Sequence, residues 1–315
     1  PIRRVRKSER GAPIEMKTTR PPVYSGTASG VGGVPLHFDV YGSGEPTIVC
    51  CNGVGVSTFF WKYVTEYFSA RHRVVAWDYR GHNRSGKPAD MSPANFTMEI
   101  NAQDCIAVLD AAKVERAVFL GHSMGCQVIF EIWHQFPERV AGLVPICGPY
   151  GHPFDTALGM PEFSRALFAA FYAAINAYPA ELQSVLRPLL RSPLPMQIAR
   201  FGAQMELQVF FLMAGEMQRH DAGPWLERIA VPTLVVAGEH DLMTPLTLAH
   251  EMADRIADAE LLVLPKGSHA GLIEHPALLN LRLEKFLRER VAIAKQPAKR
   301  KRAARKKKSA PAAAD

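Results

Sequence analysis

A serine flanked by glycines points most directly to chemistry. Ser123 stands in Gly121-His122-Ser123-Met124-Gly125, which has the form G-x-S-x-G. In such a turn the serine is strained and its Oγ is exposed, while the glycines avoid a Cβ clash. A buried strand should precede the turn and a helix should follow it, and the apolar stretches 117–120 and 127–136 fit these two elements. The helix also directs its N-terminus at the reacting group, which favours developing negative charge. We predict that Ser123 is a nucleophile.

A serine hydroxyl is a poor nucleophile without a positioned base. His269, in the segment 266–271, follows the predicted strand 261–264 and should lie at the edge where parallel strands end. Most of the other ten histidines fall on predicted helices or before the first strands. His269 is therefore the predicted base.

The base needs a carboxylate to orient it, and Asp241 follows the predicted strand 233–237. Glu239 is the alternative. Asp241 is preferred because the turn 238–240 lets the chain leave the strand before the carboxylate is placed. A purely structural interpretation of Asp241 is a helix cap before Thr244-Pro245.

Hydrolysis at a carbonyl also needs backbone N–H groups aimed at the developing oxyanion. Met124, directly after the nucleophile, supplies one predicted donor. The loop 51–55 follows the strand 47–51 and contains two glycines that allow close approach, so Val54 is the second predicted donor.

The elements that must position these residues alternate between strands and helices. The predicted strands are 36–41, 47–51, 74–77, 117–120, 143–147, 233–237 and 261–264, and the predicted helices are 58–70, 95–112, 127–136, 246–256 and 277–291. This alternation predicts an α/β protein with a parallel sheet covered on both faces. Residues 150–223 interrupt the alternation with a helix-like segment rich in Ala, Leu, Phe and Met.

Together these motifs resemble the α/β-hydrolase fold superfamily. The matching pieces are 121–125, 78–85, the strand 232–238 before Asp241, and 267–269. Over about 30–290, the resemblance implies an eight-stranded, mostly parallel sheet and a Ser-Asp-His triad. The implied domains are a core at 23–149 and 224–294 and a helical cap (lid) at 150–223. Basic, disordered tails are expected at 1–22 and 295–315.

Two positions depart from the superfamily pattern. Relatives usually carry His-Gly where this chain has Asn52-Gly53, a pair that resembles some polyhydroxyalkanoate depolymerase-like members. Relatives also usually carry Gly at the position of Asn83. Asp78 and Arg80 are expected to pair or hydrogen-bond and to brace their loop rather than to act in catalysis.

Three functions are consistent with these residues. The first is a serine hydrolase that cleaves a small apolar carboxylic ester, lactone or thioester through an acyl-enzyme. The second uses the same triad for C–C bond hydrolysis, cofactor-free perhydrolysis or acyl transfer. The third is a non-catalytic binding protein of the same fold. A nucleophilic Ser disfavours epoxide hydrolases and haloalkane dehalogenases, which need Asp at this place. The substrate itself depends on how 150–223 packs.

Composition and cysteine content narrow the class of protein. The chain has 315 residues, 48% of them apolar and 21% charged, as in ordinary globular proteins. No HExxH, Cys/His cluster or GxGxxG after a strand occurs, so neither a metal nor another cofactor is expected. The five cysteines lie in apolar stretches and are predicted to be reduced core thiols of a cytoplasmic protein.

The net charge of +7 is unevenly distributed. Residues 1–22 carry +5 and 295–315 carry +8, which leaves −6 for the body. The run from Lys299 to Lys308 either solubilises the protein or contacts a polyanion, an anionic surface or a granule. No apolar run reaches the roughly 18 residues of a membrane span. The oligomeric state is left open.

Overall fold

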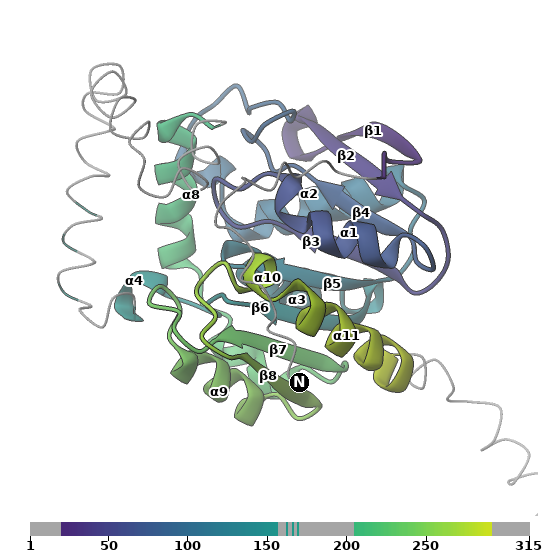
Figure 1. Cartoon of the computed structure of the whole chain (residues 1–315). Helices are drawn as coiled ribbons and strands as arrows, with labels where there is room; N and C mark the ends of the chain where they lie inside the picture. Colours follow the sequence, from purple (N-terminus) through teal and green to yellow (C-terminus); the bar gives the residue numbers. More distant parts are fainter. Residues whose placement is uncertain (1–19, 157–161, 163–165, 167–168, 170–204, 292–315) are drawn as a thin grey trace, which may run out of the picture.

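A single mixed sheet of eight strands organises the protein. The computed structural model describes residues 20–156, 162, 166, 169 and 205–291 (Figure 1). The strand order is β1-β2-β4-β3-β5-β6-β7-β8. Only the β1–β2 and β2–β4 pairs are antiparallel, and the remaining pairs are parallel. The predicted fold class, an α/β-hydrolase sheet, is confirmed.

Most strands and helices agree closely with the ranges predicted from the sequence, although a few of them had no predicted range. The strands are β1 (Tyr24–Ser29), β2 (Pro35–Tyr41), β3 (Thr47–Cys51), β4 (Val74–Trp77), β5 (Ala117–His122), β6 (Val140–Ile146), β7 (Thr233–Gly238) and β8 (Ala259–Leu264). The α-helices are α1 (Lys62–Phe68), α2 (Met98–Ala111), α3 (Met124–Gln135), α4 (Pro153–Thr156), α8 (Leu207–Arg219), α9 (Leu246–Arg255), α10 (Gly271–Glu274) and α11 (Pro276–Phe286). Short 3-10 turns lie at 31–33, 58–61, 93–95, 137–139 and 223–228, and a π turn lies at 287–291.

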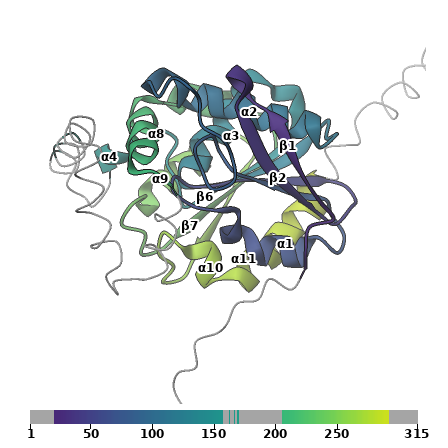
Figure 2. The same ribbon diagram turned by 90° about the horizontal axis from the view of Figure 1, so that it is seen from above.

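Both faces of the sheet are buried. Successive side chains of a strand point to opposite faces, so each strand contributes to two apolar clusters. In β3, Val49 and Cys51 join the apolar cluster that includes side chains of α2, α3, α8 and α9. Ile48 and Cys50 join the cluster on the other face, with α1, α10 and α11. Figure 2 shows these two helix layers on either side of the strands. A strand covered on both faces reads as a continuous apolar run, which is how β3 was predicted.

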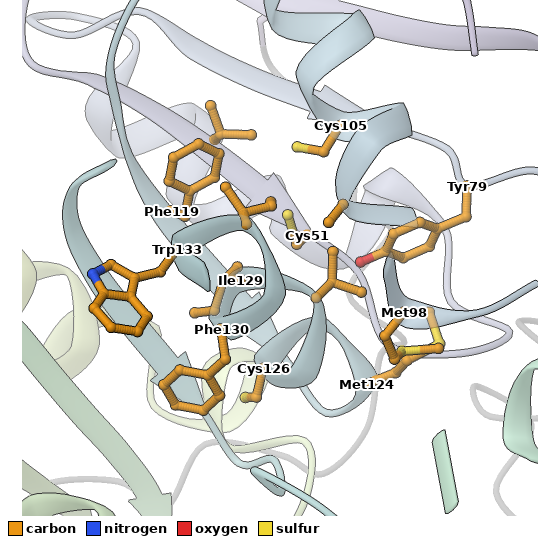
Figure 3. Packing of buried hydrophobic residues seen from close by; sticks show 14 of the residues in the cluster. Cys51, Tyr79, Met98, Cys105, Phe119, Met124, Cys126, Ile129, Phe130 and Trp133 are labelled. Carbon is orange, nitrogen blue, oxygen red and sulfur yellow. The ribbon is translucent and has the colours of Figure 1, made fainter. Parts of the chain in front are cut away.

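Sulfur-containing side chains contribute to the core around α3. Five of them, Cys51, Met98, Cys105, Met124 and Cys126, belong to one apolar cluster (Figure 3). All five cysteines are free and buried, as predicted. Burial raises the pKa of the Cys105 and Cys126 thiols well above the usual range, so they are poor nucleophiles.

Three details differ from the sequence prediction. The residues had given no signal for β1, because most of its side chains are small and several are exposed on an edge strand. The predicted helix 58–70 begins as a 3-10 turn and becomes α-helical only at Lys62. Helix α3 begins at Met124 rather than near 127, so its N-terminus directly adjoins Ser123.

The predicted cap and tails fall largely outside the described residues. Of the segment 150–223, the structure describes 150–156, which includes α4, the single positions 162, 166 and 169, and the part from Met205 onward, which includes α8. The tail 295–315 and all but Arg20–Pro22 of the tail 1–22 lie outside the description. The domain boundaries therefore stay predictions. None of the described helices is long and apolar enough to cross a bilayer.

Candidate active site

Ser123 occupies a tight turn between β5 and α3. Its φ is +53° and its ψ is −120°, a conformation that L-residues rarely adopt. A Cβ on Gly121 would lie 2.3 Å from the carbonyl oxygen of Gly125, and one on Gly125 would lie 2.2 Å from that of Cys51. Both glycines of the motif are thus required by backbone crowding, which packs the turn against the end of β3.

The structure brings the three predicted triad residues together. The Ser123 Oγ lies 3.0 Å from His269 Nε2, and His269 Nδ1 lies 2.9 Å from Asp241 Oδ2. Ser123 follows β5, while Asp241 and His269 come after β7 and β8 at the same carboxyl edge. With Nδ1 donating to the carboxylate, the lone pair of Nε2 faces the serine hydroxyl. This tautomer allows His269 to accept the serine proton.

Asp241 acts both as the partner of His269 and as a local cap. Its Oδ1 accepts the N–H groups of Met243 and Thr244, each at 2.9 Å. Its Oδ2 accepts the Thr244 hydroxyl at 2.7 Å as well as His269. Burial raises the pKa of this carboxyl, but the hydrogen bonds from His269 and Thr244 outweigh burial and hold the pKa below its usual value. The carboxylate therefore stays charged.

The rival carboxylate points elsewhere. The exposed Glu239 accepts the backbone N–H of Lys266 at 2.7 Å through Oε2. This bond ties the loop after β7 to the loop after β8. Geometry thus favours Asp241 over Glu239 as the partner of His269.

The segment 52–56, here called the oxyanion loop, passes beside the nucleophile. A Cβ on Gly53 would lie 3.1 Å from the Ser123 Cβ. Val56 N–H donates to the Gly53 carbonyl at 3.3 Å, which closes a turn with Val54 and Gly55 at its centre. Among the described residues, neither Val54 N–H nor Met124 N–H has a hydrogen-bond acceptor. Within the described part of the chain, both predicted oxyanion donors are therefore without an acceptor.

Asn52 explains the first departure from the superfamily pattern. Its side chain is buried, its Nδ2 donates to the Trp77 carbonyl at 2.9 Å, and its Oδ1 accepts the Trp61 indole N–H at 2.6 Å. An amide supplies both the donor and the acceptor that these two groups require. Asn52 therefore joins the oxyanion loop to β4 and to the turn before α1.

Asn83 explains the second departure. Its φ is +41°, in the left-handed region where Gly is favoured and where Asn is the best tolerated alternative. Its Nδ2 also donates to Asp78 Oδ1 at 3.0 Å. Asn therefore provides the turn conformation and an additional anchor for the loop that follows β4.

Asp78 and Arg80 brace this loop, but they do not pair with one another. Asp78 pairs with Arg84 at 3.2 Å. Arg80 forms a fully buried, two-point pair with Asp104 of α2, with both N–O distances at 2.7 Å. Both residues form the hydrogen bonds that were expected, but they do so with other partners: the Arg80 guanidinium points toward α2 and also donates to the carbonyls of Asn95 and Val31.

Two supporting residues were not singled out from the sequence. His122 donates from Nε2 to the His269 carbonyl at 2.9 Å, and Thr244 donates to Asp241. Asp241 and Thr244 form a D-x-x-T pattern after a strand. Asx turns are common in such a pattern, so it could have indicated that Thr244 hydrogen-bonds to Asp241. The contact of His122 joins segments 147 positions apart, so local sequence carries no signal for it.

The described residues offer no metal centre, since none of their His, Cys, Asp and Glu side chains gather in groups of three or more that could hold an ion. A cavity of about 610 Å³ lies beside the loop 78–84 and the turn before α1. Its lining includes Asp39, Asp78 and Arg84 but no triad residue.

Comparison with known proteins agrees with this fold. The model of the "Alpha/beta hydrolase family" matches residues 48–280, so the chain belongs to that family. It is 29% identical over 262 residues to a protein of Variovorax paradoxus (strain S110) named "Putative carbamate hydrolase RutD", covering 81% of this chain and 96% of that one. A protein of the same name from Agrobacterium fabrum is 30% identical over 261 residues, covering 80% and 98%.

A solved structure gives the same result. The enzyme Est816, described as an N-acyl homoserine lactone degrading enzyme, is 27% identical to this chain with a TM-score of 0.68. The match covers 83% of this chain and all of Est816. The protein is thus an α/β hydrolase. The proteins similar to it are named for the hydrolysis of carbamates or the degradation of an acyl lactone.

Proposed function

We propose that the protein is a serine hydrolase that cleaves a carboxylic ester, including lactones and thioesters, through an acyl-enzyme. The observation that supports this most strongly is the continuous chain of hydrogen bonds from Asp241 through His269 to the Ser123 Oγ. A binding protein without catalysis would have no need for a strained serine joined to a base and a charged carboxylate.

The reaction proceeds in two halves. The Ser123 Oγ attacks the carbonyl carbon, its proton passes to His269 Nε2, and the carbonyl π pair becomes an oxyanion. The N–H groups of Val54 and Met124 stabilise that oxyanion. His269 then protonates the leaving alcohol, and the acyl-enzyme forms. His269 then takes a proton from water, which attacks the acyl carbon. The acid is released as His269 returns that proton to the Ser123 Oγ.

The relatives inform the choice of substrates for assay. The lactone named for Est816 contains an ester bond, and the two bacterial relatives are named for carbamates. A carbamate carbonyl can react through the same tetrahedral intermediate. A panel of nitrophenyl esters, acyl lactones and an aryl carbamate compares these acyl groups directly. C–C hydrolysis, perhydrolysis and acyl transfer remain alternative uses of this triad.

Labelling by a fluorophosphonate probe tests the proposal. The Ser123 Oγ forms a bond to phosphorus, fluoride leaves, and the proton passes to His269. We expect stoichiometric labelling at Ser123 and turnover of a short-chain nitrophenyl ester. The Ser123→Ala variant should lose both, while Ser92→Ala, a change at a loop serine before α2, should keep both. Wild-type turnover by folded Ser123→Ala would contradict the proposal.

The basic tail is a separate proposal. We propose that the run Lys299–Lys308 adds affinity for a polyanion and does not affect the chemistry. Removal of residues 295–315 should leave kcat on a soluble ester unchanged and should abolish salt-sensitive binding to anionic vesicles or DNA. Equal binding with and without the tail would show that it serves only solubility.

A further inference from the structure

His82 contacts the oxyanion loop directly, although no step of the proposed reaction uses it. Its Nε2 lies 3.1 Å from the backbone N of Gly55, and its Nδ1 lies 3.2 Å from the carbonyl oxygen of Arg80. An amide N–H can only donate, so Nε2 must carry the lone pair. Nδ1 then carries the proton and donates it to Arg80. Both ring nitrogens have a partner in this tautomer.

The environment keeps His82 neutral. The residue is 1% exposed, and burial lowers its pKa to about 4. Protonation would place an N–H on Nε2 against the Gly55 N–H, where two donors would face each other. At neutral pH the ring is therefore a permanent acceptor for Gly55.

The backbone of His82 is fixed from several sides. Its N–H donates to the Tyr79 carbonyl at 2.9 Å, and it forms an antiparallel bridge with Met205. The preceding Gly81 packs so closely on Val209 of α8 that a Cβ would lie 2.7 Å from a Val209 methyl group. The imidazole thus extends from a rigid segment, and its Nε2 has a fixed position.

This fixed acceptor selects one orientation of the turn beside Ser123. Gly55 has φ +72° in the turn closed by Val56 N–H and the Gly53 carbonyl, as at the third position of a type II turn. Rotation of the Val54–Gly55 peptide by half a turn would convert it to type I and would remove the Gly55 N–H from His82. Asn52 holds the loop before Val54, and His82 holds it after Val54.

We propose that His82 is a positioning residue that holds the Val54–Gly55 peptide of the oxyanion loop in one orientation and thereby steadies the adjoining Gly53–Val54 peptide, whose N–H is the proposed oxyanion donor. This inference rests on the proposed function. Loss of one oxyanion donor costs about 10²–10³ in kcat, and a donor that is present but poorly held should cost part of that.

Three variants separate the acceptor from the bulk of the ring. His82→Phe keeps an aromatic ring against Tyr79 but has no acceptor. In His82→Asn the side chain is shorter, so its carbonyl oxygen does not reach the Gly55 N–H. His82→Gln returns an acceptor at about the position of Nε2. We expect kcat to fall roughly 10–100-fold in the Phe and Asn variants, with KM within about threefold, and to recover in the Gln variant. His72→Phe, a change at the opposite edge of the sheet that also removes one bond to a carbonyl, should retain kcat.

A trifluoromethyl ketone provides a readout that depends on the oxyanion. The Ser123 Oγ bonds to its carbonyl carbon, the proton moves to His269, and the carbonyl oxygen becomes an anion. Its affinity should fall by the same factor as kcat in the Phe and Asn variants, and not in the Gln variant. Hydrogen exchange of the Gly55 amide, measured by NMR, should accelerate in the same two variants.

The outcomes separate this inference from the proposed function. Folded His82→Phe with wild-type kcat and inhibitor affinity would overturn the role of His82, as would a Gln variant as impaired as the Phe variant. If the Phe variant does not fold, the Asn and Gln pair gives the same comparison. Failure of the fluorophosphonate to label wild-type Ser123 would instead overturn the hydrolase, while Gly55 exchange would still measure the contact.

Discussion

His122 donates a hydrogen bond from Nε2 to the backbone carbonyl of His269 at 2.9 Å. The residue before the nucleophile thereby holds the segment that carries the base. Burial and the neighbouring His269 lower the pKa of His122 to about 3, so the His122 ring is neutral at neutral pH. Its ring also lies 4.7 Å, between centroids, from that of Phe60.

Replacement of His122 should therefore impair the base indirectly. His122→Phe keeps the ring packing but leaves the His269 carbonyl without its donor, a loss of about 1–3 kcal/mol in a buried site. We expect a decrease in kcat of about tenfold or more, and partial recovery in His122→Gln, which restores an N–H donor. Esterase kinetics would measure the change in kcat, and fluorophosphonate labelling would measure the reactivity of Ser123. Equal kcat in wild type and the Phe variant would show that the contact does not position His269.

The carboxylate assignment can be tested with a matched pair of variants. Asp241→Asn removes the charge that orients His269 and stabilises its protonated form, so kcat should fall by about 10³–10⁴. Glu239→Gln, two residues away, should leave kcat within about twofold because this side chain contacts Lys266 instead. A larger loss from Glu239→Gln than from Asp241→Asn would reverse the assignment.

The nucleophile turn should tolerate no Cβ at its two glycines. Gly121→Ala and Gly125→Ala each place a methyl group against backbone oxygens that cannot move independently, at 2.3 and 2.2 Å. We expect destabilisation of about 3 kcal/mol or more, or failure to fold. Gly33→Ala meets no atom within 4 Å and should cost only about 1–2 kcal/mol from its φ of +75°. Urea unfolding of the three variants would provide these values.

Two buried histidines should make stability depend on pH. The pKa values of His82 and His122, about 4 and about 3, lie below the usual 6.5 because burial penalises the charged ring. Below pH 6.5 the unfolded chain binds protons at these positions and the folded chain does not. The contribution of the two histidines to the free energy of unfolding is then fully present above pH 6.5. It is lost as the pH falls toward their pKa values in the folded protein.

Each histidine should contribute a slope of about 1.4 kcal/mol per pH unit between pH 6 and 5. His82→Gln should reduce the total slope by the contribution of one histidine. His72→Phe should reduce the slope less, because His72 is only half-buried and its pKa is lowered less strongly. Urea unfolding at pH 7, 6 and 5 would measure this. An unchanged slope in His82→Gln would contradict a neutral, buried His82.

The sequence by itself determined most of the sheet, and it singled out the three side chains that the structure brings together as the proposed triad. Apolar runs such as 47–51 could be recognised because a strand covered on both faces needs an apolar side chain at each position. Ser123, Asp241 and His269 could be ranked because each follows such a run, and the carboxyl ends of parallel strands share one edge. These signals are local in the chain, so they survive without coordinates.

Tertiary structure decided the contacts between distant segments. Arg80 selects Asp104 rather than Asp78, Asn52 joins two tryptophans, and His122 reaches the His269 carbonyl. Each polar side chain had several candidate partners in the sequence, and the choice depended on which groups became buried together without water. Strand β1 also needed the fold, since its small side chains carry little pattern and its position is set by pairing with β2.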